Sequence, residues 1–153
     1  MIVGLDTGVL VAASIEDHPD HDAARQTLDR LRVSNDLLAV APQVLTEFIH
    51  VVTDQRRFNT PLTVSSAIAL AEELWTTGET YRALTGSRAI RQFSIWMTQF
   101  RLGRKRVLDT MLAATYFQAN ITTILTTNPA DFSVFGVFTC RLPTPDPWKD
   151  NSC

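Results

Sequence analysis

The sequence predicts a three-layer α/β/α fold in which helices cover both sides of a short, mostly parallel sheet of four or five strands. Three observations predict it. Short apolar runs alternate along the chain with segments of helical periodicity, which is the order of βαβ units. The apolar runs are continuous, as is typical of buried parallel strands. The chain has 153 residues, a length that favours one compact domain.

The first part of the chain is predicted to form one strand and two helices. The apolar run at 2–6 ends on Asp6 and has the length of a buried strand. A helix-like apolar stretch follows at 9–15, and small or apolar residues recur with helical spacing at 19–33. This order puts Asp6 at the carboxyl end of the first strand.

The middle of the chain is predicted to continue the same alternation. An apolar run at 37–41 forms the second strand, and Pro42 opens a helix to about residue 55, because proline is tolerated in the first helical turn. Apolar residues share one face of a helix over 62–76. Residues 79–84 are predicted to form a short strand.

Two further helices and one strand are predicted after this point. Ser87 is expected to cap a helix over 88–101, since its hydroxyl can accept a hydrogen bond from the first turn. A second helix covers 109–120, and the apolar run at 122–126 forms a strand.

The end of the chain contains turn and tail signals. Asn128-Pro129 predicts a turn, and 135–141 is expected to be a final edge strand. The segment 143–153 contains several prolines and is predicted to be a loosely held, flexible tail. The folded domain is therefore expected to cover 1–142.

Composition and charge exclude several classes of protein. The chain is 45% hydrophobic and 20% charged, which is typical of a soluble globular domain. A net charge of −2 argues against a wholly basic nucleic-acid binder, although a nuclease needs only a local basic patch. No stretch approaches the roughly 18 apolar residues that span a membrane, and the start lacks the basic region of a signal peptide. Two cysteines without metal-site spacing suit a reducing compartment, so we expect a cytoplasmic protein.

Three acidic residues lie at the edges of apolar elements. Asp6 ends the first strand, Glu47 lies at or beside the apolar face of the helix after the second strand, and Asp109 opens a later helix. Taken singly, each has an ordinary explanation as a helix cap, a buried ion pair or an acid favoured by the helix dipole. Taken together, they predict one site at the carboxyl edge of the sheet, where open α/β folds bind ligands.

Two more polar residues follow the strand at 122–126. Asp131 can add a carboxylate, and Asn128 can offer an amide oxygen to a metal or a donor to a substrate. The alternative is a turn closed by an Asx side chain. Clustered carboxylates repel one another, and a divalent cation is the usual remedy. Oxygen ligands suit Mg²⁺ or Mn²⁺, whereas the three histidines have no spacing that predicts zinc.

The motifs that carry these residues resemble those of PIN-domain ribonucleases, most of all the VapC toxins of bacterial toxin–antitoxin pairs. They are Asp6-Thr7-Gly8-Val9-Leu10, Glu47, the segment at 109–114 and the segment at 126–132. The resemblance covers nearly the whole chain. It implies a Mg²⁺- or Mn²⁺-dependent endoribonuclease that forms a homodimer and is inhibited by a small antitoxin protein.

The resemblance also implies roles for individual residues. Asp6 and Asp109 are expected to bind the metal with Glu47, and Asp131 is expected to join them in catalysis. Thr7, Asn128, Arg104 and Arg106 are expected to contact the RNA.

Two positions depart from the family pattern. Gly8 stands where the family usually has an asparagine that orients the acidic site, and Asn128 stands where an acid is usual. Many relatives share the second change, and we expect Asp131 to supply the missing carboxylate.

A basic run precedes the third acid. Arg101, Arg104, Lys105 and Arg106 stand out on a nearly neutral chain and can grip RNA phosphates, although a solvated loop or an antitoxin contact fits them equally. Trp96 is expected in the core rather than stacked on bases.

The partners are predicted from apolar helices. The helices over 42–55 and 62–76 carry more apolar side chains than a small core hides, so we expect a groove there for an antitoxin helix or strand. These side chains are Phe48, Val51, Val52, Leu62 and Leu70, with Phe58 between the two helices. The alternative is that they complete the core of a monomer.

Two rival functions remain. A haloacid-dehalogenase-like phosphatase also places an aspartate after its first strand, but it needs a second acid where this chain has Gly8. The other rival is a catalytically silent PIN-like module that binds RNA or protein.

Overall fold

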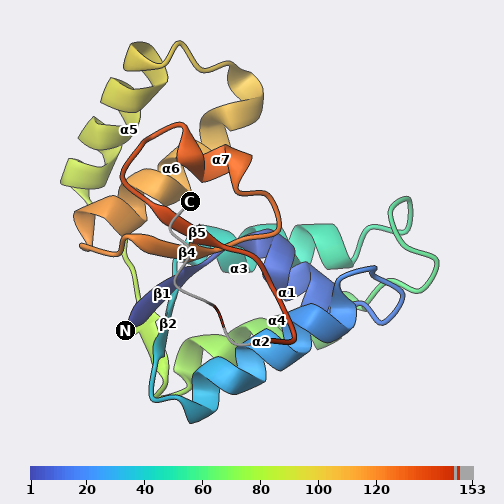
Figure 1. Cartoon of the computed structure of the whole chain (residues 1–153). Helices are drawn as coiled ribbons and strands as arrows, with labels where there is room; N and C mark the ends of the chain where they lie inside the picture. The colour runs from blue at the N-terminus through green and yellow to red at the C-terminus, as the bar shows by residue number, and fades with distance from the viewer. Residues whose placement is uncertain (147, 149–153) are drawn as a thin grey trace.

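The computed structural model describes residues 1–146 and 148 and contains a five-stranded parallel sheet with helices on both sides (Figure 1). Every pair of neighbouring strands is parallel, and the strand order is β3-β2-β1-β4-β5. The predicted α/β fold class is therefore confirmed. The strands are β1 (Ile2–Leu5), β2 (Leu37–Val40), β3 (Thr80–Arg82), β4 (Thr123–Leu125) and β5 (Thr139–Arg141).

The helices fall into two groups around this sheet. In Figure 1, α5, α6 and α7 lie above the sheet, whereas α2 and α4 lie below it. The helices are α1 (Thr7–Ser14), α2 (His21–Val33), α3 (Pro42–Val52), α4 (Val64–Thr76), α5 (Ser87–Gln99), the 3₁₀ turn η1 (Arg104–Arg106), α6 (Val107–Gln118) and α7 (Ala130–Ser133).

The strand order reverses direction at the middle of the sheet. From β1 the chain adds β2 and β3 on one side, and it then returns to add β4 and β5 on the other side. The connections therefore diverge between β1 and β4, which is where open parallel sheets leave room for a ligand at their carboxyl ends. Asp6 follows β1 directly, and Thr126 follows β4 directly.

The centre of the sheet packs against α6 through Tyr116. Its ring is fully buried, and its hydroxyl group lies 2.6 Å from the carbonyl oxygen of Leu5 and 3.0 Å from that of Ala39. A Cβ atom on Gly4 would lie 2.8 Å from the Tyr116 ring, so only glycine leaves room for it. Burial raises the pKa of the Tyr116 hydroxyl, which remains a neutral donor.

An aromatic cluster fills the space between α5 and the C-terminal segment. Trp96 is 5% exposed and stacks on Phe135 with ring centroids 4.4 Å apart. Phe138 meets the edge of the same Trp96 ring. The prediction that Trp96 lies in the core is confirmed. Phe135 is a core residue and the partly buried Phe138 packs against the core; both precede β5, so the predicted strand over 135–141 is shorter than expected.

Several element boundaries differ from the prediction. The first helix begins at Thr7, directly after Asp6, because the backbone leaves the strand at that residue. Ser87 is the first helical residue of α5, and Gly86 occupies the cap without a side-chain hydrogen bond, so the predicted Ser87 cap is wrong. The turn at Asn128-Pro129 leads into the short helix α7, which the sequence analysis did not predict.

Part of the predicted tail is held against α2. The backbone N–H of Thr144 donates to the Thr27 hydroxyl at 2.9 Å, and Arg30 donates to the Thr144 and Pro145 carbonyl oxygens. The Trp148 ring lies against the Arg30 guanidinium. These contacts differ from the expected loosely held tail; residues 147 and 149–153 lie outside the described part of the chain.

The apolar side chains that predicted a partner surface are mostly used inside the protein. Phe48 and Val52 belong to a second core between α1, α3 and α4, and Val51, Phe58 and Leu62 pack against it. Leu70 is the member of the set that is exposed. Most of these side chains therefore pack inside the protein and are not available to a partner. None of the helices among the described residues is long and apolar enough to cross a membrane.

Candidate active site

Asp6 is the most buried of the predicted acids. It follows β1 as the N-cap residue of α1, its side chain is 9% exposed, and it makes no side-chain cap to the helix. Instead its Oδ2 atom accepts a hydrogen bond of 2.7 Å from the hydroxyl of Thr126. The backbone N–H of Asp6 also donates to the Leu125 carbonyl oxygen at 3.0 Å. Contacts from β4 therefore fix both the backbone and the carboxylate of Asp6.

Glu47 approaches the same edge from α3. Pro42 starts this helix directly after β2, so that Glu47 comes one and a half turns beyond the end of the strand. Its Oε2 atom accepts a hydrogen bond of 3.1 Å from the hydroxyl of Thr7, the residue that follows Asp6. Glu47 is half-buried, and this bond ties its carboxylate to the start of α1.

Asp109 lies in the first turn of α6 and is half-buried. Burial, together with the charges of Asp131, Asp6 and Glu47, raises its pKa to about 7, while the charge of Arg106 opposes the rise. Burial likewise raises the pKa of Asp6 to about 6 against the effect of the Thr126 hydrogen bond, with Glu47 and Asp131 adding to the rise. The four acids therefore lie close enough to influence one another electrostatically.

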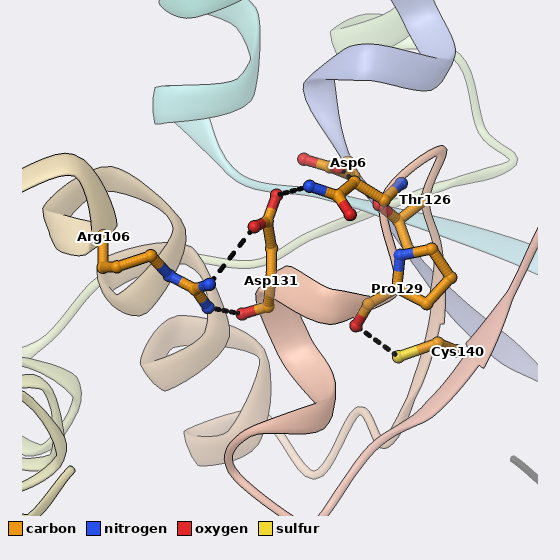
Figure 2. Close-up of polar contacts among 7 residues, drawn as sticks. Asp6, Arg106, Thr126, Pro129, Asp131 and Cys140 are labelled. Carbon is orange, nitrogen blue, oxygen red and sulfur yellow. Dashed lines mark hydrogen bonds and ion pairs between the residues drawn. The ribbon is translucent and has the colours of Figure 1, made fainter.

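Asp131 is held differently from the other three acids, and Figure 2 shows its contacts with Arg106. Its Oδ1 atom lies 3.3 Å from Nη1 of Arg106, and its Oδ2 atom accepts a hydrogen bond of 2.9 Å from the side-chain amide of Asn128. Nη2 of Arg106 also donates to the backbone carbonyl oxygen of Asp131. Both carboxylate oxygens of Asp131 therefore already have protein donors.

A divalent cation fits the chemistry of this donor set. The site offers carboxylate oxygens, which Mg²⁺ and Mn²⁺ prefer, and its buried acids have no cationic partner as close as the one that Asp131 has. Within residues 1–146 and 148, no three His, Cys, Asp or Glu side chains form a ready-made metal site. Mg²⁺ commonly binds one or two carboxylates and keeps several waters, so it does not require three protein ligands.

The four residues predicted to contact RNA have different positions. The buried hydroxyl of Thr7 is committed to Glu47, and the amide of Asn128 is committed to Asp131. Arg106 is paired with Asp131, whereas Arg104 is exposed in η1. Arg104 and Asn128 are therefore the two members of this set that are exposed to solvent.

The sequence analysis missed the role of the threonine pair after β4. The buried Thr126 hydroxyl donates to Asp6 and accepts the backbone N–H of Asn128 at 3.0 Å. A Cβ atom on Gly8 would lie only 2.7 Å from Oγ1 of Thr127. The sequence feature that could have indicated this role is the pair of threonines directly after a buried strand, at the same edge of the sheet as Asp6.

The order of these elements and acids matches a known protein family. The family model described as PIN domain matches residues 3–136. The chain belongs to the PIN-domain family. The matched range includes all four acids. It argues against the alternative of a haloacid-dehalogenase-like phosphatase.

Two curated proteins resemble part of this PIN domain. Ribonuclease VapC31 of Mycobacterium tuberculosis is 37% identical over 68 residues, which are 44% of this chain and 48% of the relative. Ribonuclease VapC25 of the same organism is 35% identical over 68 residues, with the same two shares. The chain thus spans about half the length of the curated relatives it matches.

Solved structures share the PIN fold over most of the chain. VapC20 of Mycobacterium tuberculosis, described as a Sarcin-Ricin loop cleaving toxin, has a TM-score of 0.68 at 17% identity and covers 90% of this chain and 96% of its own. VapBC2 from Rickettsia felis, bound to a DNA fragment from its promoter, has a TM-score of 0.66 at 19% identity, with coverages of 93% and 98%. At such identities the similarity concerns the fold.

Proposed function

We propose that the protein is an endoribonuclease that hydrolyses RNA phosphodiester bonds and acts in the cytoplasm as the toxin of a toxin–antitoxin pair. The observation that carries the proposal is the meeting of Asp6, Glu47, Asp109 and Asp131 at the carboxyl edge of a PIN-domain sheet, with raised pKa values at the two most affected acids. The names of the related ribonucleases and of the VapC20 toxin support it.

Asp6 and Asp109 are the residues proposed to hold Mg²⁺ or Mn²⁺, with Glu47 beside them. A bound ion of this kind lowers the pKa of its water and neutralises charge on the phosphoryl oxygens. Burial and the neighbouring acids disfavour the ionised forms of these two aspartates. A bound cation would therefore stabilise them more than the other acids.

Glu47 is proposed to orient and deprotonate the attacking water. Thr7 donates to Oε2 of Glu47, while Oε1 receives no hydrogen bond from the residues that the structure describes. That free oxygen can accept a proton, because a carboxylate is an acceptor on both atoms. Thr7 then fixes which oxygen of Glu47 faces the reaction.

Asp131 is proposed to act mainly through Arg106 and Asn128. Both of its carboxylate oxygens are occupied, so it positions these two donors instead of offering a free oxygen to a metal. Arg106 and the exposed Arg104 then supply positive charge for RNA phosphates at the entrance to the acidic site.

An antitoxin is the proposed protein partner, and a groove between α1, α2 and α4 is its proposed binding surface. The groove has a volume of about 580 Å³, with Leu10, Leu28 and Leu74 among its apolar residues and Arg25, Arg32 and Glu73 among its charged ones. Such a mixture suits an amphipathic helix. The crystal structures of VapBC complexes support a partner of this kind.

A homodimer is the proposed assembly. Large apolar side chains are about half exposed or more on or beside the α5–α6 pair, and a second copy of the chain would cover them. They are Leu84, Ile90, Ile95 and Leu108. Sedimentation of the purified chain tests this, since a monomer at tens of micromolar contradicts the proposal.

RNA cleavage by the purified protein tests the proposed function. We expect cleavage in Mg²⁺ or Mn²⁺, loss of cleavage with a chelator, and recovery when the metal is restored. Sequencing the ends of cleaved RNA after expression in a cell identifies the substrate. A folded, metal-loaded protein that cleaves no RNA and does not slow cell growth contradicts the proposal and favours a silent binding module.

A further inference from the structure

Gly8 and Thr127 share a space that is too small for a second side chain. Gly8 lies in the first turn of α1, and a Cβ atom there would be 2.7 Å from Oγ1 of Thr127, closer than real Cβ contacts. The same point would be 4.0 Å from Oδ2 of Asp6. The Thr127 hydroxyl and the Asp6 carboxylate therefore border one small space beside Gly8.

The Thr127 hydroxyl is the uncommitted donor of its segment. Thr126 donates to Asp6, and the Asn128 side chain donates to Asp131. Thr127 is half-buried, and its hydroxyl makes no hydrogen bond within residues 1–146 and 148. A hydroxyl group that lies near the Asp6 carboxylate and has no hydrogen bond to the described protein is available to a bound molecule.

The acidic site needs such a donor. Ionised carboxylates only accept hydrogen bonds and repel phosphate, so a phosphodiester in this space must be held by donors and cations. Threonine hydroxyls are common donors to phosphate oxygens of nucleic acids. Thr127 offers this group next to Asp6, whereas Arg104 and Arg106 approach from η1 at the start of α6.

We propose that Thr127 is a substrate-contacting residue whose hydroxyl donates a hydrogen bond to a non-bridging oxygen of the scissile phosphate, and that Gly8 is the positioning residue that leaves room for it. The proposal rests on the ribonuclease function proposed above. Adding even a methyl group at position 8 moves the Thr127 hydroxyl away from the place it has beside Asp6.

Steady-state cleavage of an RNA oligonucleotide in Mn²⁺ tests the contact at Thr127. Thr127→Val keeps the shape but removes the donor, and we expect kcat/KM to fall about 10- to 100-fold, the range for loss of a hydrogen bond to a charged group. Thr127→Ser restores the donor and is expected to recover most of that loss. Thr122→Val, at the other end of β4, is the matched control and is expected to match the wild type within about twofold.

Thermal unfolding without metal tests the packing independently of catalysis. Gly8→Ala is expected to lower the melting temperature of the wild type by about 3 °C or more, because the new methyl group meets the Thr127 hydroxyl. In a Thr127→Ala background the clash is absent, and the same change is expected to raise the melting temperature, since alanine is favoured over glycine in helices. Equal shifts in the two backgrounds overturn the assignment of Gly8.

The cleavage assay separates this proposal from the ribonuclease proposal. If the wild type and Thr127→Val cleave equally while Asp6→Asn is inactive, the ribonuclease function stands and the role of Thr127 is overturned. If the wild type cleaves no RNA, both are overturned. Loss of activity in Thr127→Val without recovery in Thr127→Ser also overturns the hydroxyl contact.

Discussion

The two ends of the central sheet hold their acids in opposite ways. At the carboxyl end, burial and the charges of neighbouring acids together raise the pKa of Asp6 to about 6 and that of Asp109 to about 7. At the amino end, Asp36 precedes β2 and receives the N-terminal ammonium group of Met1 at 2.8 Å and the Ser34 hydroxyl at 2.7 Å. The hydrogen bond from that ammonium group lowers the pKa of Asp36.

The difference is in the partner: the acid at the amino end of the sheet has a cation beside it, whereas the acids at the carboxyl end have other acids beside them. Asp36 has a cation within contact distance, whereas Asp6 and Asp109 have each other and Glu47. Repulsion between like charges in a partly buried site lowers the free energy of unfolding, and packing elsewhere in the core has to compensate for it. Acids whose pKa values are raised by burial and by one another are characteristic of functional sites, which is why we propose one here.

The largest expected contrast between the two ends is in catalysis. Asp6→Asn and Asp109→Asn are each expected to lower RNA cleavage by about 10³-fold or more, as loss of a group that organises transition-state charge does. Asp36→Asn is the matched control at the other end and is expected to leave cleavage unchanged. Near-normal cleavage by a well-folded Asp6→Asn protein contradicts the role of Asp6.

The second contrast is the effect of pH on the metal-free protein. Folded Asp6 and Asp109 retain protons that the unfolded chain loses near pH 3.8, so the free energy of unfolding falls as pH rises from about 4 to about 7. For Asp6 the shift corresponds to about 3 kcal/mol. Asp109 is more exposed and contributes less than its shift implies, because solvent screens it.

Urea unfolding between pH 4 and pH 8 in a chelator measures this dependence. The lowered pKa of Asp36 acts in the opposite direction, since its stabilisation is present above pH 3.8 and is lost as pH falls further. Asp6→Asn is expected to flatten the decline above pH 4, whereas Asp36→Asn is expected to leave it. Equal slopes for the wild type and Asp6→Asn contradict the assignment.

The third contrast is the response to a divalent cation. Mg²⁺ or Mn²⁺ at 100 times its dissociation constant is expected to stabilise the wild type by about 2.7 kcal/mol at pH 8, measured by thermal unfolding. The effect is expected to shrink at pH 5, because protons compete with the metal for the same carboxylates. A chelator reverses it, and Asp6→Asn removes most of it. An unchanged response in Asp6→Asn places the metal elsewhere.

The smallest expected effect is the change in stability when Asp36, at the amino end of the sheet, loses its ion pair. Asp36→Asn removes the ion pair with the N-terminal ammonium group and is expected to cost about 0.5 kcal/mol, as is common for ion pairs near the surface. High salt is expected to reduce that difference, because mobile ions screen the pair. Chemical denaturation at low and high salt measures both values. A loss of cleavage in this variant contradicts the division between the two ends.

The approach of the acids to one edge of the sheet was predictable because sequence order decides where parallel strands end. Asp6 and Asp131 follow apolar runs, and all strands of one parallel sheet end at the same edge. Glu47 and Asp109 were predictable from their places near the starts of helices. Their positions depend on short connections, which leave little freedom between a strand and the next element.

The pairing of polar groups inside the site was not predictable from spacing. Asp131 is chemically equivalent to Asp6, yet Arg106 and Asn128 occupy both of its oxygens. Which donors pair with a given carboxylate depends on the directions of side chains from elements that are far apart in the chain. The same limit explains β5, since Phe135 and Phe138 have a strand-like pattern but pack around Trp96. Tertiary packing there overrides local preference.

The contact between Gly4 and Tyr116 has a consequence for how this sequence can change over generations. A Cβ atom at position 4 would lie 2.8 Å from the ring, so a larger residue there is tolerated only if position 116 shrinks at the same time. Shrinking position 116 alone leaves a cavity and two backbone carbonyl groups without their hydroxyl donor. The two positions are therefore expected to evolve as a pair, and a library randomised at both and selected for folding is expected to return matched combinations far more often than single changes.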